Sequence, residues 1–263
     1  MQIFAAYDLT DSHKLTFSEL FEDDSERVLT DCEMSALVKA TRGQIARHPH
    51  YMPNYAILLA ILTGMRVGEI VALRWFDIYD EYIHIDHSEH RLEFQSHEEA
   101  VAAYKKGWMQ RQYDIVEPIP MNSERTYILA IGEPKNNRHR VFPIVTEIAD
   151  LLEEIRTLGM VSKDGSRYTG HDIACAAARR GDEAGISKTC IHEIRRTWSS
   201  NALKTHSRKL VANLLGHLEE TNARFYDYDT SSSDQKKEVV AQMCSNVLNF
   251  NDFVKSKKEA KAL

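Results

Sequence analysis

Four separated clusters of the sequence bring together arginine, lysine, histidine and tyrosine, side chains that bind phosphate or exchange protons and covalent bonds with it. The clusters are Thr63–Trp75, Pro134–Pro143, His192–Arg196, and Leu215–His217 with Tyr226 nine residues after the histidine. These residue types suit an exchange of phosphodiester bonds in which a side chain, and not a metal-bound water, attacks the phosphorus.

Such an exchange needs positive charge, a nucleophile and a proton donor. Arginine binds the non-bridging phosphate oxygens well because its planar fork gives charged, often bidentate bonds, so Arg66 and Arg195 are the candidates. A tyrosine, with an ordinary pKa of about 10, attacks only when a base accepts its proton and positive charge favours the phenolate. The departing oxygen needs a proton, which Lys135 is placed to donate.

Helix boundaries are expected to position these groups. Thr63-Gly64 interrupts an apolar helical pattern that resumes at Val67, which puts Arg66 at a joint between two helices. Taken alone, the spacing of Arg66 and Glu69 is equally typical of an exposed ion pair at such a joint.

The later clusters also fit helix ends and faces. His192 and Arg195 are three residues apart, which places a base and a cation on one face of a helix. Gly216 follows an apolar helical stretch and is predicted to end it, so that His217 projects from a helix terminus.

The fold class expected from these patterns is mostly α with a small three-stranded antiparallel β-sheet (α+β). Alternating residues predict strands at 82–86, 126–131 and 140–144. Helices are predicted before and after them, beginning with a capping box at Thr30 and Glu33 and interrupted near Gly181, Gly185 and Gly216. We expect an acidic linker or N-terminal extension at 1–26, one domain at 27–248 with an insertion at 93–122, and a tail at 249–263.

Charge is unevenly distributed along the chain. The formal net charge is −6, but residues 179–210 carry eight basic and three acidic side chains, a local net of +5. Nucleic-acid binding responds to a local basic face and not to the total. The four cysteines form no C-x-x-C pair, and no apolar run of about 20 residues is present. A cytoplasmic protein with no membrane partner is expected.

The four clusters, in this order, resemble the tyrosine recombinase (phage integrase) family over about 200 residues, from Leu29 to near Asp229. The matching motifs are T-G-x-R-x-x-E with Arg66, a lysine before R-x-x-P with Lys135, H-x-x-R with His192 and Arg195, and L-G-H with His217 followed by Tyr226.

This resemblance implies a role for each matched residue. Arg66 and Arg195 would clamp the scissile phosphate, His217 would hydrogen-bond it, Lys135 would protonate the leaving 5′ oxygen, His192 would be the general base, and Tyr226 would form a 3′-phosphotyrosyl bond. Neither a metal nor another cofactor is implied. The expected partners are double-stranded DNA and, on DNA, a tetramer of this chain. The basic residues expected to contact DNA are Arg138, Arg140, Arg196 and Lys209.

Several alternatives stay open at this point. Tyr228 rivals Tyr226 as the nucleophile, and the same chemistry would serve a type IB-like topoisomerase, while a non-catalytic DNA-binding protein is a third possibility. The family's usual N-terminal DNA clamp does not match the fewer than 30 residues before the domain, so weak DNA binding is expected. An apolar stripe either closes the domain's own core or binds a partner subunit; it comprises Val239, Val240, Met243, Val247 and Leu248.

Overall fold

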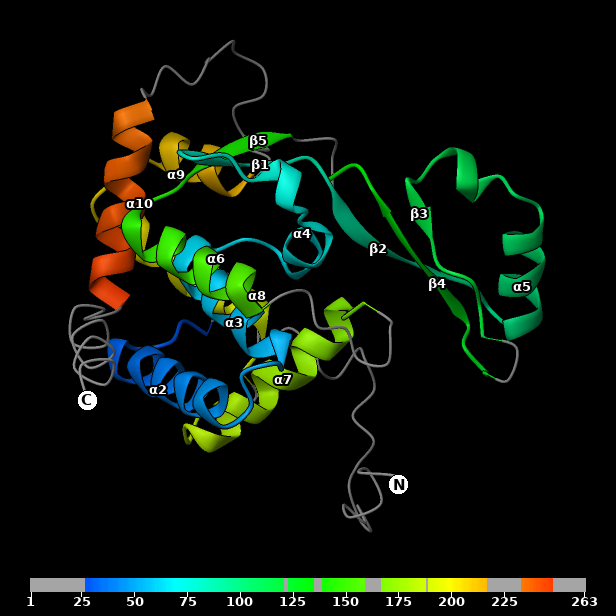
Figure 1. Cartoon of the computed structure of the whole chain (residues 1–263), viewed down its shortest axis with the longest axis horizontal. Coiled ribbons are helices and arrows are strands. Elements are labelled where there is room, and N and C mark those ends of the chain that lie inside the picture. The colour runs from blue at the N-terminus through cyan, green and yellow to red at the C-terminus, as the bar shows by residue number, and fades with distance from the viewer. Residues whose placement is uncertain are drawn as a thin grey trace.

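The computed structural model describes residues 27–120, 123–134, 139–158, 167–187, 189–216 and 233–247. It shows a helical body with a smaller lobe projecting from one side (Figure 1). The helices are α2 (Asp31–Arg47), α3 (Met52–Thr63), α4 (Val67–Ala72), α5 (His97–Lys105), α6 (Thr146–Leu158), α7 (Gly170–Glu183), α8 (Ile191–Ala202), α9 (Arg208–Leu215) and α10 (Ser233–Val247), with short 3-10 helices η1 (Trp75–Asp77) and η2 (Met109–Arg111). The strands are β1 (Tyr82–Ile85), β2 (Ser88–Glu93), β3 (Ile115–Val116), β4 (Tyr127–Gly132) and β5 (Arg140–Pro143).

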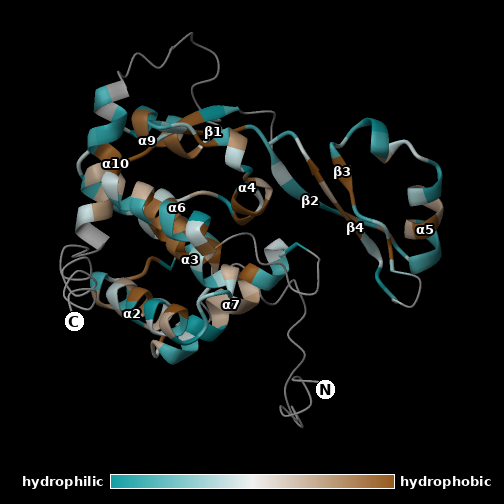
Figure 2. Cartoon of the chain, viewed as in Figure 1, coloured by the Kyte–Doolittle hydropathy of each residue, from teal (hydrophilic) through white to brown (hydrophobic). Residues whose placement is uncertain are grey.

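Helix α3 lies at the centre of the body. Ten of its 12 residues are buried, and α2, α6, α7, α8 and α10 all pack against it. A helix that is apolar on every side cannot face water and has to be surrounded, which makes α3 the axis of the core. Figure 2 shows that the helices around α3 are coloured in both hydrophobic brown and hydrophilic teal.

The predicted capping box is present at the start of α2. The side chain of Thr30 accepts a hydrogen bond from the backbone N–H of Glu33, and a Glu33 carboxylate oxygen accepts one from the backbone N–H of Thr30 at 2.8 Å. This reciprocal arrangement satisfies two donors that would otherwise lack partners at the helix terminus.

The prediction of one three-stranded sheet made from the three strands was wrong in its pairing. All three strands are present, but β1 pairs with β5 in a two-stranded sheet, whereas β4 pairs with β2 and β3 in a separate three-stranded sheet. Strands β2 and β3 were not predicted. Strand β2 ends where the segment 93–122 begins, and β3 lies inside that segment. Both strands pair with β4, a long-range contact that local alternation does not reveal.

The projecting lobe contains α5, η2 and β3, which lie within the segment 93–122 and fold against the strands β2 and β4 (Figure 1). A small separate core lies between helix and sheet, with Ala103, Met109 and Ile128 buried. On the side of the body, Glu89 of β2 accepts hydrogen bonds from the Arg167 guanidinium at 2.6 Å and the Gly170 backbone at 2.8 Å.

The structure also tests two expectations about the helices, the break near Gly181 and the apolar stripe of α10. Gly181 does not interrupt a helix but lies inside α7, where a Cβ would collide with the Thr189 side chain, so glycine serves close packing there. In α10, Val239, Val240 and Met243 are buried in the main core. This part of the stripe therefore closes the chain's own core; the side chain of Val247 and all of Leu248 lie outside the described residues.

Candidate active site

Arg66 is placed at the joint of α3 and α4 by a glycine. Gly64 ends α3 with a left-handed backbone (φ 63°), a conformation that glycine adopts without a Cβ clash. A Cβ at Gly64 would also lie 2.9 Å from Leu215 Cδ2 and 3.0 Å from Trp198 Cγ. The turn thus needs glycine both for its conformation and for its packing, and it directs Arg66 toward α8 and α9.

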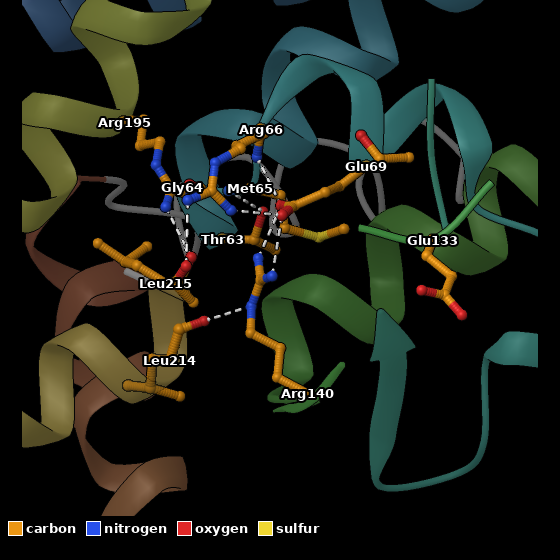
Figure 3. A network of polar contacts seen from close by, with 12 residues as sticks. Thr63, Gly64, Met65, Arg66, Glu69, Glu133, Arg140, Arg195, Leu214 and Leu215 are labelled. Atoms are coloured by element: carbon orange, nitrogen blue, oxygen red, sulfur yellow. Dashed lines mark hydrogen bonds and ion pairs between the residues drawn. The ribbon is translucent and has the colours of Figure 1, made fainter. Parts of the chain in front are cut away.

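Glu69 is the hub of the polar network in Figure 3. Its Oε1 accepts hydrogen bonds from Arg66 Nη1 at 2.8 Å and Arg140 Nη1 at 2.9 Å. Its Oε2 accepts from the Arg66 backbone N–H at 2.8 Å and Arg140 Nη2 at 2.7 Å. The side chain of Glu69 is 1% exposed, so the reading of an exposed ion pair at this joint was wrong.

Three arginines bind the end of α9, one on each of three successive carbonyls (Figure 3). Arg140 Nε donates to Leu214 O at 2.8 Å, Arg195 Nη2 to Leu215 O at 2.6 Å, and Arg66 Nη2 to Gly216 O at 3.1 Å. Cations are favoured at a helix C-terminus, where carbonyls lack intrahelical partners. Gly216 has the predicted left-handed stop conformation, with φ 64°.

The charges of this cluster do not cancel. Three guanidiniums contribute +3 and Glu69 contributes −1, a formal net of +2. Burial, together with the nearby charges of Arg66 and Arg140, lowers the pKa of Arg195 to about 9, against the opposing effect of Glu69. Arg195 is therefore still charged at neutral pH, and an anion at this site would relieve the repulsion between the guanidiniums.

The arginines keep donors for a ligand. Arg195 uses one N–H of Nη1 on Gly64 O at 2.6 Å and one of Nη2 on Leu215 O, and a guanidinium has five N–H groups. Arg66 likewise uses one on each terminal nitrogen, and its side chain is 24% exposed. Arg66 is thus the more open of the two, and Arg195 is nearly enclosed at 3%.

The ionisation of Glu69 makes the network sensitive to acid. Burial alone would raise the pKa of this carboxyl, but the hydrogen bonds and charge of Arg140, with the charges of Arg195 and Arg66, lower it from 4.5 to about 2. A depressed carboxyl pKa stabilises the fold above the unfolded-state value, and this stability is lost as pH falls toward the folded-state value.

We therefore expect the unfolding free energy of the wild-type chain to fall relative to that of Glu69→Gln by about 2 kcal/mol between pH 6 and pH 3. Urea unfolding of both proteins across this range measures the difference. Comparing the two proteins at each pH cancels the titration of the other carboxyls. A difference that stays constant with pH would contradict the depressed pKa.

The remaining predicted residues are found in different surroundings. His192 is exposed on α8, three residues before Arg195. Arg196, on the same helix, donates to the Arg27 backbone carbonyl at 3.3 Å, and Lys209 is half-buried on α9. Arg140 is buried, its side chain 5% exposed. Four predicted residues lie outside the described residues: Lys135, Arg138, His217 and Tyr226, as does the rival Tyr228.

The residues that precede α2 bind to helix α8. The Leu29 backbone N–H donates to Thr197 Oγ1 at 2.9 Å, and Arg27 forms an ion pair with Glu193 at 3.2 Å. These contacts lie on residues that alternate with His192 and Arg195 along the helix. The two contacts fix the helix that carries His192 and Arg195. The local sequence pattern did not predict that Arg27 and Leu29 would bind this helix.

Sequence reasoning missed the roles of Glu69 and Arg140. Both lie inside the motifs, but their spacing of 71 residues gives no local signal that they pair. One signal was available, since an acid three residues after Arg66 matches a helix-capping pattern. Among the described residues, no group of three or more His, Cys, Asp or Glu side chains could hold a metal ion.

No protein-family model matches the sequence, and no curated protein sequence matches it. Solved structures do match, and they define a class of fold: the chain has the fold of a tyrosine recombinase catalytic domain, as the motifs indicated. One such structure is the Tn1549 transposon integrase in complex with transposon right end DNA. The TM-score is 0.52 at 16% sequence identity, covering 87% of this chain and 70% of that chain.

The same integrase in complex with a circular intermediate DNA also has a TM-score of 0.52 at 16% identity, covering 86% of this chain and 69% of that one. A lambda integrase tetramer bound to a Holliday junction matches at a TM-score of 0.47 and 17% identity, over 77% of this chain. The chain spans 49% of that lambda integrase chain and 63% of the XerA recombinase chain.

Proposed function

We propose that this chain is a site-specific DNA recombinase or integrase, which cleaves and rejoins DNA strands through a 3′-phosphotyrosyl intermediate without metal or ATP. The observation that carries the proposal is the convergence of Arg66 and Arg195 on the end of α9, with an excess of positive charge and N–H donors to spare. A phosphodiester is an anion that this arrangement suits. The fold and the four motifs support the choice of DNA as the substrate.

In the proposed reaction, Tyr226 Oη attacks the scissile phosphorus and gives its proton to His192. The bond between phosphorus and the 5′ oxygen breaks, and Lys135 protonates the departing oxygen. Arg66 and Arg195 stabilise the charge that develops on the non-bridging oxygens, while His217 hydrogen-bonds one of them. The new phosphotyrosyl ester replaces the broken ester, so a 5′ hydroxyl can reverse the step and no ATP is consumed.

We propose that the DNA backbone also contacts Arg138, Arg196 and Lys209, since phosphate contacts dominate affinity for nucleic acid. Residues 27–248 would form the catalytic domain, with 93–122 as an insertion, 1–26 as an acidic linker or extension, and 249–263 as a tail. Four copies are expected to assemble on two DNA sites in the cytoplasm.

Covalent trapping tests the proposal. The chain, with chelator present, would be incubated with nicked DNA substrates drawn from candidate attachment sites and then resolved on a denaturing gel. A protein–DNA adduct that survives denaturation and carries the 3′ end of the cut strand is expected. Adducts on every DNA, together with relaxation of supercoils but no exchange between two sites, would favour a type IB-like topoisomerase. DNA binding without any adduct, even when an N-terminal DNA clamp is fused to the chain, would favour a non-catalytic DNA-binding protein.

A further inference from the structure

Arg140 is a buried charge that points into the body and away from solvent. It lies on β5, where it is paired with Ile85 of β1, and its guanidinium extends to α4 and to the end of α9 (Figure 3). All three of its nitrogens donate hydrogen bonds: Nε to Leu214 O, and Nη1 and Nη2 to the carboxylate of Glu69. With 5% of its side chain exposed, Arg140 has little surface to offer to DNA.

The bidentate bond from Arg140 fixes the orientation of the Glu69 carboxylate. A carboxylate has about four acceptor positions, and those of Glu69 are divided between Arg140 and Arg66, two bonds each. The carboxylate cannot rotate without breaking bonds to both arginines. Without Arg140, Glu69 and Arg66 would remain bound to each other but would be free to move as a pair.

A glycine in the L-G-H motif makes room for this arginine. A Cβ at Gly216 would lie 2.8 Å from Arg140 Nη1 and 3.2 Å from its Cζ. The guanidinium therefore packs directly over the Gly216 backbone, whose carbonyl accepts the bond from Arg66. This contact is independent of the ion pair, and it joins Arg140 to the same helix end that binds Arg66 and Arg195.

We propose that Arg140 is a positioning residue of the phosphate site: it holds the Glu69 carboxylate, which directs Arg66, and it anchors β5 to the end of α9. The proposal rests on the proposed function and deepens it, because Arg140 then serves cleavage without touching DNA. It also replaces the expectation of a DNA contact for Arg140. Arg140 thereby joins α4, β5 and α9, which are far apart in the sequence. This junction becomes part of the geometry of the proposed active site.

A single-turnover test on nicked DNA distinguishes positioning from DNA contact. Arg140→Gln is expected to slow cleavage of bound DNA by about 10²-fold, the scale of a displaced catalytic group, while the DNA dissociation constant changes by less than about threefold. Its salt dependence is expected to stay unchanged, because no phosphate contact is lost. Weaker binding with a salt slope reduced by about one would overturn the proposal in favour of a DNA contact.

A double-mutant cycle distinguishes positioning from a general structural role. In an Arg66→Ala background, Arg140→Gln is expected to slow cleavage by less than about fivefold further, because it acts through Arg66. A full additional 10²-fold loss would show that Arg140 acts independently of Arg66, which would overturn the proposal.

Arg140→Gln alone leaves Glu69 charged and buried with fewer partners, which can unfold the chain. The paired variant Glu69→Gln/Arg140→Gln removes both charges and is the second variant for this case. It is expected to fold and to cleave no faster than one-tenth of the wild-type rate, because Arg66 then loses the carboxylate that directs it and keeps only its bond to the Gly216 carbonyl. Wild-type cleavage by this variant would overturn the proposal.

One readout does not depend on cleavage at all. The Nε–H resonance of Arg66 in a ¹H–¹⁵N spectrum, assigned by its loss in Arg66→Lys, is expected to shift in Arg140→Gln relative to wild type, and in the paired variant relative to Glu69→Gln alone. An unshifted resonance would overturn the positioning role. If the wild-type chain forms no covalent adduct even with an N-terminal DNA clamp fused to it, the proposed function fails and this resonance still decides the role of Arg140.

Discussion

Tyr226→Phe is expected to abolish the covalent protein–DNA adduct, lowering its yield by on the order of 10⁴-fold or more, as is usual when the nucleophile of a covalent catalyst is removed. Phenylalanine has the same ring but no Oη, so no phosphotyrosyl ester can form. DNA binding should change little, because a single hydroxyl is lost. The measurement is the adduct yield on nicked DNA together with the dissociation constant of the same DNA.

Tyr228→Phe is the matched control, since it removes the same atom two residues further along the chain. We expect this variant to form the adduct at close to the wild-type rate. Loss of the adduct in Tyr228→Phe alone would keep the reaction class and move the nucleophile to Tyr228. Persistence of the adduct in both single variants and in the double variant would rule out either tyrosine and contradict the proposed chemistry.

Features encoded by neighbouring residues were predictable from the sequence. The capping box at Thr30 and the stops at Gly64 and Gly216 involve groups within a few residues of one another, and all three are present. Local helix signals therefore placed Arg66 and Arg195 on the correct elements. The tight approach of Trp198 and Leu215 to Gly64 adds a reason for that glycine that no local pattern contains.

Pairing between distant segments was not predictable. The alternation at 140–144 identified β5, but not that Arg140 turns inward, because the side of a strand that is buried depends on the partner it meets. The same holds for Glu69: its spacing from Arg66 is local, yet its burial depends on a guanidinium 71 residues away. Charges that look solvent-exposed in sequence can thus form the interior of a site when opposite charges and carbonyls converge on them.

Arg195→Lys is expected to have the second large effect, slowing cleavage by about 10²- to 10³-fold, the scale for losing a donor that stabilises transition-state charge. Lysine keeps the charge, but its single nitrogen cannot reproduce the fork that reaches Gly64 O and Leu215 O while leaving N–H groups for phosphate. A buried carbonyl left without its partner costs about 1–3 kcal/mol, so the unfolding free energy should fall as well. Single-turnover cleavage well below the melting temperature separates the two effects.

Arg180→Lys is the control for the effect of replacing a buried arginine that lies away from the proposed site. Arg180 is 7% exposed on α7, and its Nη2 forms an ion pair with Glu183 at 2.8 Å, so this substitution also removes a buried guanidinium. Burial lowers the pKa of Arg180 as it does that of Arg195, but the carbonyls at the end of α9 accept from Arg140, Arg195 and Arg66 instead. We expect Arg180→Lys to destabilise the chain while leaving cleavage within about threefold of wild type, since only lost packing is at stake. Equal losses of cleavage in both variants would mean that Arg195 supports the fold alone, and the phosphate site would then have to be sought around Arg66 without it.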